Sequence, residues 1–206
     1  MNEPNDSLEF WQNQYNAGTT GLDRGCVHPA IIDWLMCGEL SSCQIVVPGC
    51  GRGHEVIHLS GLGFDVTALD YAEAPIDFLK QRLAEQGLPA TVLHRDMFCW
   101  DHAQTFDAVY EQTCLCAIRP ELRTRYEYRV FNWLRQGGKL FLLMVQTDIQ
   151  NGPPFHCDPN EMKTLFSDER WEWPSTAMKK YAHPSGRLYE LGTVLVRKPE
   201  KGAQVS

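Results

Sequence analysis

The stretch VVPGCGRGHE, residues 46–55, decides the fold of this chain. It includes the end of a short apolar run, CQIVVP (43–48), which is typical of a buried strand. Gly49, Gly51 and Gly53 follow directly, and a helical pattern begins after them. Glycines permit a tight turn and let backbone N–H groups approach a ligand closely, because no Cβ stands in the way. A strand, a glycine loop and a helix in this order predict a site for a nucleotide-like ligand.

The same stretch also fits a zinc-site pattern, because residues 54–58 read His-Glu-Val-Ile-His. In such sites two histidines one helical turn apart hold the metal, and the glutamate acts on its bound water. No His-x-x-Gly-x-x-His extension follows, and Gly61 and Gly63 end the helix expected from about 53 to 61. A zinc hydrolase therefore stays open as an alternative, and we assign no residue as a metal ligand.

The rest of the chain alternates strand and helix patterns, which is typical of a parallel sheet covered by helices. Apolar and β-branched runs predict further strands at 64–70, 90–96, 106–112 and 139–146. Amphipathic or capped patterns predict helices at 72–87, 120–138 and 158–167. Two extended stretches around the turn-like HPSG (183–186) predict a C-terminal antiparallel hairpin. We find no repeat and no linker, so residues 1–206 are expected to form one domain.

Composition limits the partners of the protein. Its net charge of −7 argues against a nucleic-acid backbone or an anionic membrane as the main partner, since both favour basic surfaces. The first residues, MNEPNDSLEF, are polar and acidic, so we expect neither export nor membrane insertion. The eight cysteines include no Cys-x-x-Cys pair and predict free thiols in a reducing cytoplasm. We expect a cytoplasmic monomer or weak homodimer that binds a small molecule.

Two acidic residues end the strands that follow the glycine loop. Asp70 ends the second expected strand, where a carboxylate can accept both hydroxyl hydrogens of a ribose. Asp96 ends the third and precedes MFCW (97–100), so a carboxylate and apolar side chains could meet an adenine ring. The loop spacing is not Gly-x-Gly-x-x-Gly, and no Gly-Lys-Ser/Thr follows it. The sequence therefore predicts a nucleoside-containing cofactor that is neither a dinucleotide nor a P-loop nucleotide.

These residues resemble the thiopurine methyltransferase superfamily of class I S-adenosylmethionine (SAM) methyltransferases, especially its halide and thiol methyltransferase branch. The resemblance rests on FWQNQYNAGTTGLDRG (10–25), VVPGCGRGHEV (46–56), VTALDYAEAPI (66–76), RDMFCW (95–100), FDAVYEQTCLCAIRPELR (106–123) and NGPPF (151–155). It implies a Rossmann-like α/β fold. The sheet would have seven mostly parallel strands, with helices on both faces and an antiparallel hairpin at the C-terminal end.

The resemblance also implies where SAM binds. Residues 1–40 would form a lid or cap, in which Trp11, Tyr15 and Leu22 cover the methionine end of the cofactor. The other implied contacts come from strand ends: Gly49 and Gly51 for the methionine part, Asp70 for the ribose, Asp96 and Met97 for the adenine, and Gln112 for the sulfonium side. The chain departs from many relatives at Tyr15 and Leu22, where tryptophan is common, and at Gln112, where tyrosine or arginine is common.

The resemblance implies an enzyme that transfers a methyl group from SAM to a small molecule and releases S-adenosylhomocysteine. The expected acceptor is a thiol or thiopurine sulfur, or a halide. An oxygen, nitrogen or metalloid acceptor, and a SAM-binding protein without turnover, remain as alternatives. A neutral thiol must lose its proton before it attacks, and His28 and His156 are the histidines best placed in loops to accept it. Either histidine could instead be a packing or surface residue.

Overall fold

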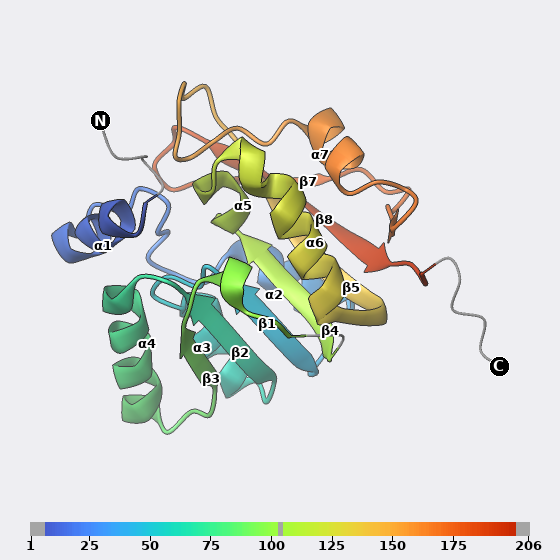
Figure 1. The fold of residues 1–206 in the computed structure, drawn as a ribbon. Helices are drawn as coiled ribbons and strands as arrows, with labels where there is room; N and C mark the ends of the chain where they lie inside the picture. Colours follow the sequence, from blue (N-terminus) through green and yellow to red (C-terminus); the bar gives the residue numbers. More distant parts are fainter. Residues whose placement is uncertain (1–6, 103–104, 201–206) are drawn as a thin grey trace.

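The computed structural model describes residues 7–102 and 105–200, and its strands form one mixed sheet (Figure 1). Neighbouring strands follow the order β3-β2-β1-β4-β5-β8-β6, and β7 also pairs with β8. The strands are β1 (Gln44–Pro48), β2 (Asp65–Asp70), β3 (Thr91–His94), β4 (Phe106–Gln112), β5 (Leu134–Gln146), β6 (Trp171–Glu172), β7 (Lys179–Ala182) and β8 (Tyr189–Arg197). β1 to β5 run parallel, whereas β8 runs antiparallel to β5, β6 and β7.

Helices cover both faces of this sheet, with α6 on the near face and α2 and α3 on the far face in Figure 1. The helices are α1 (Leu8–Ala17), α2 (Pro29–Met36), α3 (His54–Gly61), α4 (Glu73–Gln86), α5 (Cys114–Ala117), α6 (Arg123–Trp133) and α7 (Pro159–Leu165), with single 3-10 turns η1 (Met97–Cys99) and η2 (Pro120–Leu122). Within the described residues, none of these helices is both long and apolar enough to cross a membrane.

Two apolar cores follow from the alternation of side chains along the strands. In β1, Ile45 and Val47 pack into a cluster with α2, α3 and α4, while Val46 packs into a second cluster with α6 and α7. Successive side chains of a strand point to opposite faces, so a central strand covered on both faces reads as a continuous apolar run. The α/β fold predicted from the strand and helix alternation is confirmed.

The helix expected over 120–138 is shorter than predicted. It begins as η2, continues as α6 and ends at Trp133, and β5 begins at once with Leu134. Leu134 is fully buried and pairs with Phe106 across a bulge, so the chain enters the sheet before the glycine pair is reached. Gly138 lies in the irregular part of β5, where a Cβ would meet the carbonyl oxygen of Arg135 at 2.9 Å. The glycine pair therefore serves a strand irregularity and does not end the helix.

Within the described residues the sheet has eight strands, where seven were expected. The extended stretch 171–182, predicted as one arm of the C-terminal hairpin, is divided into β6 and β7, and both pair with the same edge of β8. Pro174 lies between them and lacks the N–H group that a continuous ladder would use. The mostly parallel order, the helices on both faces and the antiparallel hairpin are confirmed.

The two glycines that flank α3 allow a matched test of packing. Gly53 and Gly63 flank α3 with φ angles of 70° and 82°, and a Cβ at Gly53 would approach Leu79 Cδ1 to 2.5 Å, whereas a Cβ at Gly63 would meet nothing within 4 Å. We expect Gly63→Ala to lower the free energy of unfolding by about 1–2 kcal/mol through backbone strain alone. Gly53→Ala should lose about 1–3 kcal/mol more, because Leu79 is fully buried and must move.

Urea unfolding of both variants and the parent measures this difference. Equal losses for the two glycines would show that the contact with Leu79 relaxes without cost.

Candidate functional site

A cavity of about 400 Å³ opens at the carboxyl ends of β1 to β4, under α1 and the segment that follows it. This volume falls in the range of small-molecule sites, and its place fits open α/β sheets, whose ligands collect at the carboxyl ends of the strands. The nine residues predicted to contact the cofactor all line it: Trp11, Tyr15, Leu22, Gly49, Gly51, Asp70, Asp96, Met97 and Gln112. The structure therefore brings these residues to one cavity.

The glycine loop forms a close-packed wall of the cavity. Gly49 and Gly51 have φ angles of 57° and 51°, in the left-handed region that side chains other than glycine rarely adopt. A Cβ at Gly49 would meet Cys114 Sγ at 2.9 Å, and one at Gly51 would meet Tyr15 Oη at 2.8 Å. Any larger residue at these positions would push against α5 or α1, so the loop needs glycine for its shape and for its neighbours.

Asp70 fixes the shape of this loop from the end of β2. Its Oδ2 accepts a hydrogen bond from Gly51 N at 3.0 Å, and its Oδ1 accepts one from Ala72 N at 2.9 Å. Burial raises the pKa of Asp70, while the N–H groups of Ala72 and Gly51 act in the opposite direction. Each carboxylate oxygen has a second lone pair, so the group can accept hydrogen bonds from a ligand without losing these contacts.

Helix α1 lies at the mouth of the cavity and contacts α4. It is capped by Ser7, whose Oγ accepts from Phe10 N at 3.0 Å. Gln12 Oε1 accepts from Glu73 N at 2.9 Å, and thereby caps the first turn of α4 from another helix. Every residue of α1 stays at least partly exposed in the described structure, so this helix is held by few buried contacts.

The histidine and glutamate of the zinc-like pattern have other partners. His54 Nε2 lies 3.0 Å from Asp23 Oδ1, and Glu55 Oε1 accepts from the backbone N of His28 at 2.9 Å. The hydrogen bond with Asp23 raises the pKa of His54, and the same bond lowers the pKa of Asp23. Across residues 7–102 and 105–200, no three His, Cys, Asp or Glu side chains are placed to hold a metal ion. His54 and Glu55 instead connect the segment after α1 to the start of α3.

Neither His28 nor His156 is among the described residues that line the cavity. His28 is fully buried, its Nδ1 accepts from Ala30 N as the cap of α2, and its Nε2 lies 2.9 Å from Glu190 Oε2. His156 Nδ1 accepts from Thr147 N at 3.1 Å. Both histidines therefore make structural contacts, and neither lies among the described residues that line the cavity.

Tyr110 and Arg24 line the cavity but were not singled out in the sequence. Tyr110 is fully buried on β4, and its hydroxyl donates to Gln112 Oε1 at 2.9 Å, which leaves the Gln112 amide nitrogen to donate to a ligand. Residues two apart on a strand share a face, so the spacing of Tyr110 and Gln112 could have indicated this pair. Arg24 has partners far along the chain, which no local pattern shows.

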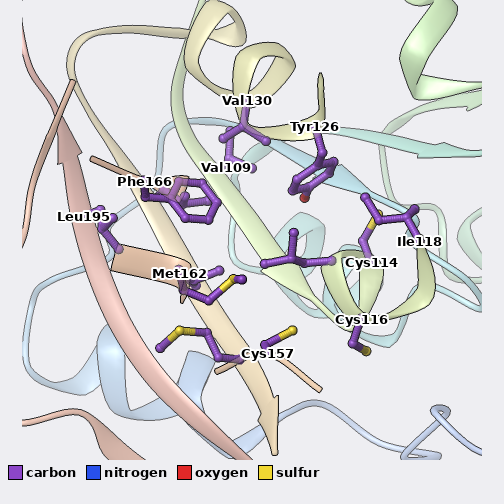
Figure 2. Packing of buried hydrophobic residues seen from close by; sticks show 14 of the residues in the cluster. Val109, Cys114, Cys116, Ile118, Tyr126, Val130, Cys157, Met162, Phe166 and Leu195 are labelled. Carbon is purple, nitrogen blue, oxygen red and sulfur yellow. The ribbon is translucent and has the colours of Figure 1, made fainter. Parts of the chain in front are cut away.

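A buried carboxyl supports the chain just beyond Gln112. Glu111 Oε1 accepts from Leu115 N at 2.8 Å, and its Oε2 accepts a short hydrogen bond from the Tyr126 hydroxyl. Figure 2 shows Tyr126 beside Val109 and Cys114 in the apolar cluster on this face of the sheet. Burial raises the pKa of Glu111 to about 7, so the folded state favours the protonated carboxyl.

This carboxyl predicts a pH dependence of stability. Because the folded pKa lies above the usual value of 4.5, the stabilising contribution of Glu111 is complete below pH 4.5 and is lost as the pH rises through about 7. The loss amounts to about 3 kcal/mol. Glu111→Gln keeps the shape of the side chain but does not ionise. The free energy of unfolding of this variant, relative to that of the parent, should therefore increase between pH 5 and pH 8. Urea unfolding at both pH values measures the gain, and a constant difference would contradict the assignment.

The strand order, the glycine loop after β1 and the acid that ends β2 together define the class I SAM-dependent methyltransferase fold. Solved structures agree. A 1,6-didemethyltoxoflavin-N1-methyltransferase from Burkholderia thailandensis, with bound 1,6-didemethyltoxoflavin and S-adenosylhomocysteine, is similar with a TM-score of 0.77 at 18% identity, over 97% of this chain and 92% of that one. TehB from Haemophilus influenzae is similar with a TM-score of 0.66 at 20% identity, over 93% and 67% of the two chains.

The chain belongs to the thiopurine S-methyltransferase family, whose model matches residues 6–197. It is 30% identical over 161 residues to a probable thiol methyltransferase 2 of Arabidopsis thaliana, with 76% of this chain and 70% of the relative covered. It is 27% identical over 175 residues to a thiopurine S-methyltransferase of Vibrio cholerae, with 77% and 80% covered. The protein is therefore a methyltransferase with SAM as its donor, and the resemblance stated from the sequence is confirmed.

Proposed function

We propose that this enzyme methylates the sulfur of a small thiol or thiopurine, or a halide. The observation that carries the proposal is the kinship of the whole cavity-forming chain with enzymes that are named for sulfur acceptors. These relatives include the probable thiol methyltransferase, the Vibrio enzyme and a thiocyanate methyltransferase 1 of Brassica oleracea, which is 28% identical over 148 residues. An oxygen, nitrogen or metalloid acceptor is the alternative, and a SAM-binding protein without turnover is the most distant one.

The residues that line the cavity support SAM as its ligand. Gly49 and Gly51 would let the loop backbone approach the methionine part, since neither carries a Cβ. Asp70 presents a fixed carboxylate for the ribose hydroxyls, since two backbone N–H groups orient it. Asp96 and Met97 follow β3, and Asp96 is oriented by the bond that its Oδ1 accepts from Phe98 N. These two residues would meet the adenine.

The remaining contacts come from the lid and from β4. Trp11 and Tyr15 lie near each other, with ring centroids 6.5 Å apart, and with Leu22 they would cover the methionine end. Gln112 would lie on the sulfonium side, with its amide oriented by Tyr110. We propose residues 1–40 as the lid of a single domain spanning 1–206. Of these, residues 1–6, 103–104 and 201–206 lie outside the described structure.

When bound, SAM supplies a methyl group on a positively charged sulfur, which is already activated for transfer. The chain then has to align the acceptor, orient its polar atom and exclude water. The one histidine among the described lining residues, His54, has its Nε2 in a hydrogen bond with Asp23. An acceptor that ionises easily, such as a thiol or thiopurine, suits this site because it needs little help in losing its proton.

Charge and composition support the wider setting of this proposal. A net charge of −7 suits a small-molecule acceptor better than a nucleic acid or an anionic membrane surface. Eight cysteines without a Cys-x-x-Cys pair suit the reducing cytoplasm. We propose a cytoplasmic enzyme that acts as a monomer or weak homodimer, and sedimentation at several concentrations measures its oligomeric state.

Asp70→Ala tests the cofactor site. The substitution removes the carboxylate at the end of β2 and should weaken binding of S-adenosylhomocysteine by more than about tenfold, since hydrogen bonds to a charged group contribute about 1.5–3 kcal/mol. Asp65→Ala is the matched control, because Asp65 begins the same strand at the opposite edge of the sheet. Calorimetry measures both affinities. Full affinity in the Asp70 variant would overturn the role given to this carboxylate.

The acceptor class is tested by turnover. Purified enzyme is incubated with SAM and, in separate reactions, a small aliphatic thiol, a thiopurine, iodide, a phenol and an amine. We expect S-adenosylhomocysteine to form only with the sulfur or halide acceptors, and mass spectrometry locates the methyl group. Product from the phenol or amine alone would favour the alternative, and tight cofactor binding with no product would favour a protein without turnover.

A further inference from the structure

Arg24 presents an unsatisfied donor at the cavity. Its side chain is only 5% exposed, it lines the cavity, and its Nε is a buried atom without a hydrogen-bond partner. Among the described residues that line the cavity, no other side chain carries such an atom. A buried donor left without a partner costs about 1–3 kcal/mol, so a group that supplies an acceptor at this position is favoured.

The rest of the guanidinium is fixed in place. Arg24 Nη1 pairs with Glu190 Oε2 at 2.8 Å, and Nη2 donates to the carbonyl oxygen of Ala182 at 2.9 Å. Glu190 is fully buried, and its Oε2 also lies 2.9 Å from His28 Nε2. Two bonds from a planar group leave it little freedom to rotate, so the direction of the Nε–H bond is set by β7 and β8.

Arg24 lies at the acceptor end of the cavity. Its partners are on β7 and β8, which follow β4 and β5 in the sheet, whereas Asp70 and Asp96 follow β2 and β3 on the other side of β1. Gln112, at the end of β4, is between these two groups in strand order, and its amide nitrogen is available to the cavity. Both residues line the cavity on the side away from the strands that carry Asp70 and Asp96, and Arg24 carries the charged donor.

We propose that Arg24 Nε and the Gln112 amide form a subsite for the negatively charged atom of the methyl acceptor. The inference rests on the proposed function and adds that the acceptor enters as an anion, a thiolate or a small inorganic anion. Hydrogen bonds from a guanidinium to an anion are stronger than bonds between neutral groups. An acceptor held in this form brings its own electron pair and needs no base. Arg24 is then a specificity-determining residue.

Binding of thiocyanate to the complex of the protein with S-adenosylhomocysteine tests the subsite without turnover. We expect Arg24→Gln to weaken thiocyanate binding by more than about tenfold, because a charge-assisted bond is lost. Affinity for S-adenosylhomocysteine should stay close to that of the parent, because the proposed nucleoside contacts, Asp70 and Asp96, come from other strand ends. Arg24→Lys should be intermediate, since it keeps the charge but lacks the Nε–H donor. Arg135→Gln is the control, because it removes an exposed arginine paired with Asp107.

Glu190→Gln separates an electrostatic role of Arg24 from a structural one. Both Arg24 and His28 contact Oε2, and Oε1 has no partner within the described residues, so a glutamine can keep its carbonyl oxygen at the shared position. This variant removes the charge that offsets Arg24 and should bind thiocyanate more tightly. If Arg24 and Glu190 only held the fold together, Arg24→Gln and Glu190→Gln would both weaken thiocyanate binding.

The outcomes distinguish the two levels of the proposal. A parent protein that binds no S-adenosylhomocysteine would contradict the proposed function itself. Binding of S-adenosylhomocysteine without thiocyanate, or equal thiocyanate affinity in Arg24→Gln, would overturn the anion subsite alone. Loss of S-adenosylhomocysteine affinity in a folded Arg24→Gln would assign Nε to the cofactor carboxylate and also overturn it. If Arg24→Gln fails to fold, thiocyanate binding by Arg24→Lys and Glu190→Gln tests the subsite instead. Weaker thiocyanate binding by Glu190→Gln would then contradict it.

Discussion

The hydrogen bonds of Asp70 connect the parts of the cavity that come from different strands. Its carboxylate accepts from Gly51 in the loop after β1 and from Ala72 at the start of α4, and its carbonyl oxygen accepts from Arg95 after β3. Three connections at the carboxyl edge of the sheet therefore converge on one residue. Because the carboxylate is buried, it is held in place before a ligand enters, and a preorganised group loses less entropy on binding.

The side of the cavity formed by α1 and the segment after it is built differently. It is held mainly by polar contacts between segments, such as Gln12 with the first turn of α4 and Asp23 with His54. The residues of α1 are at least partly exposed throughout the described helix, and Trp11 packs against the apolar cluster that includes α6. In the proposed lid, a cover held largely by polar contacts suits an enzyme that must admit a large cofactor and later exclude water from the reacting atoms.

Local patterns in the sequence predicted the part of the cavity formed by strand ends, because its contacts are short-range or follow from strand alternation. The glycine loop, Asp70 and the strand that ends at Gln112 all belong to such patterns. Its place in a loop suggested His28 as a candidate base, whereas its ring nitrogens contact Ala30 and Glu190, and the latter lies 162 residues away. The bond between Arg24 and Glu190 spans 166 residues, so neither periodicity nor a motif could reveal it.

The two ends of the cavity offer different polar groups, in a way that suits methyl transfer. Asp70 and Asp96 lie at the end formed by β2 and β3, where hydroxyl and amino groups of a nucleoside need hydrogen-bond acceptors. Arg24 lies at the end beside β7 and β8, where it offers a donor. The sulfonium of SAM and an anionic methyl acceptor attract each other, and the anion also needs a hydrogen-bond partner from the protein. Arg24 would provide that partner. Because Glu190 offsets its charge, the pair adds no net positive charge that would repel the sulfonium.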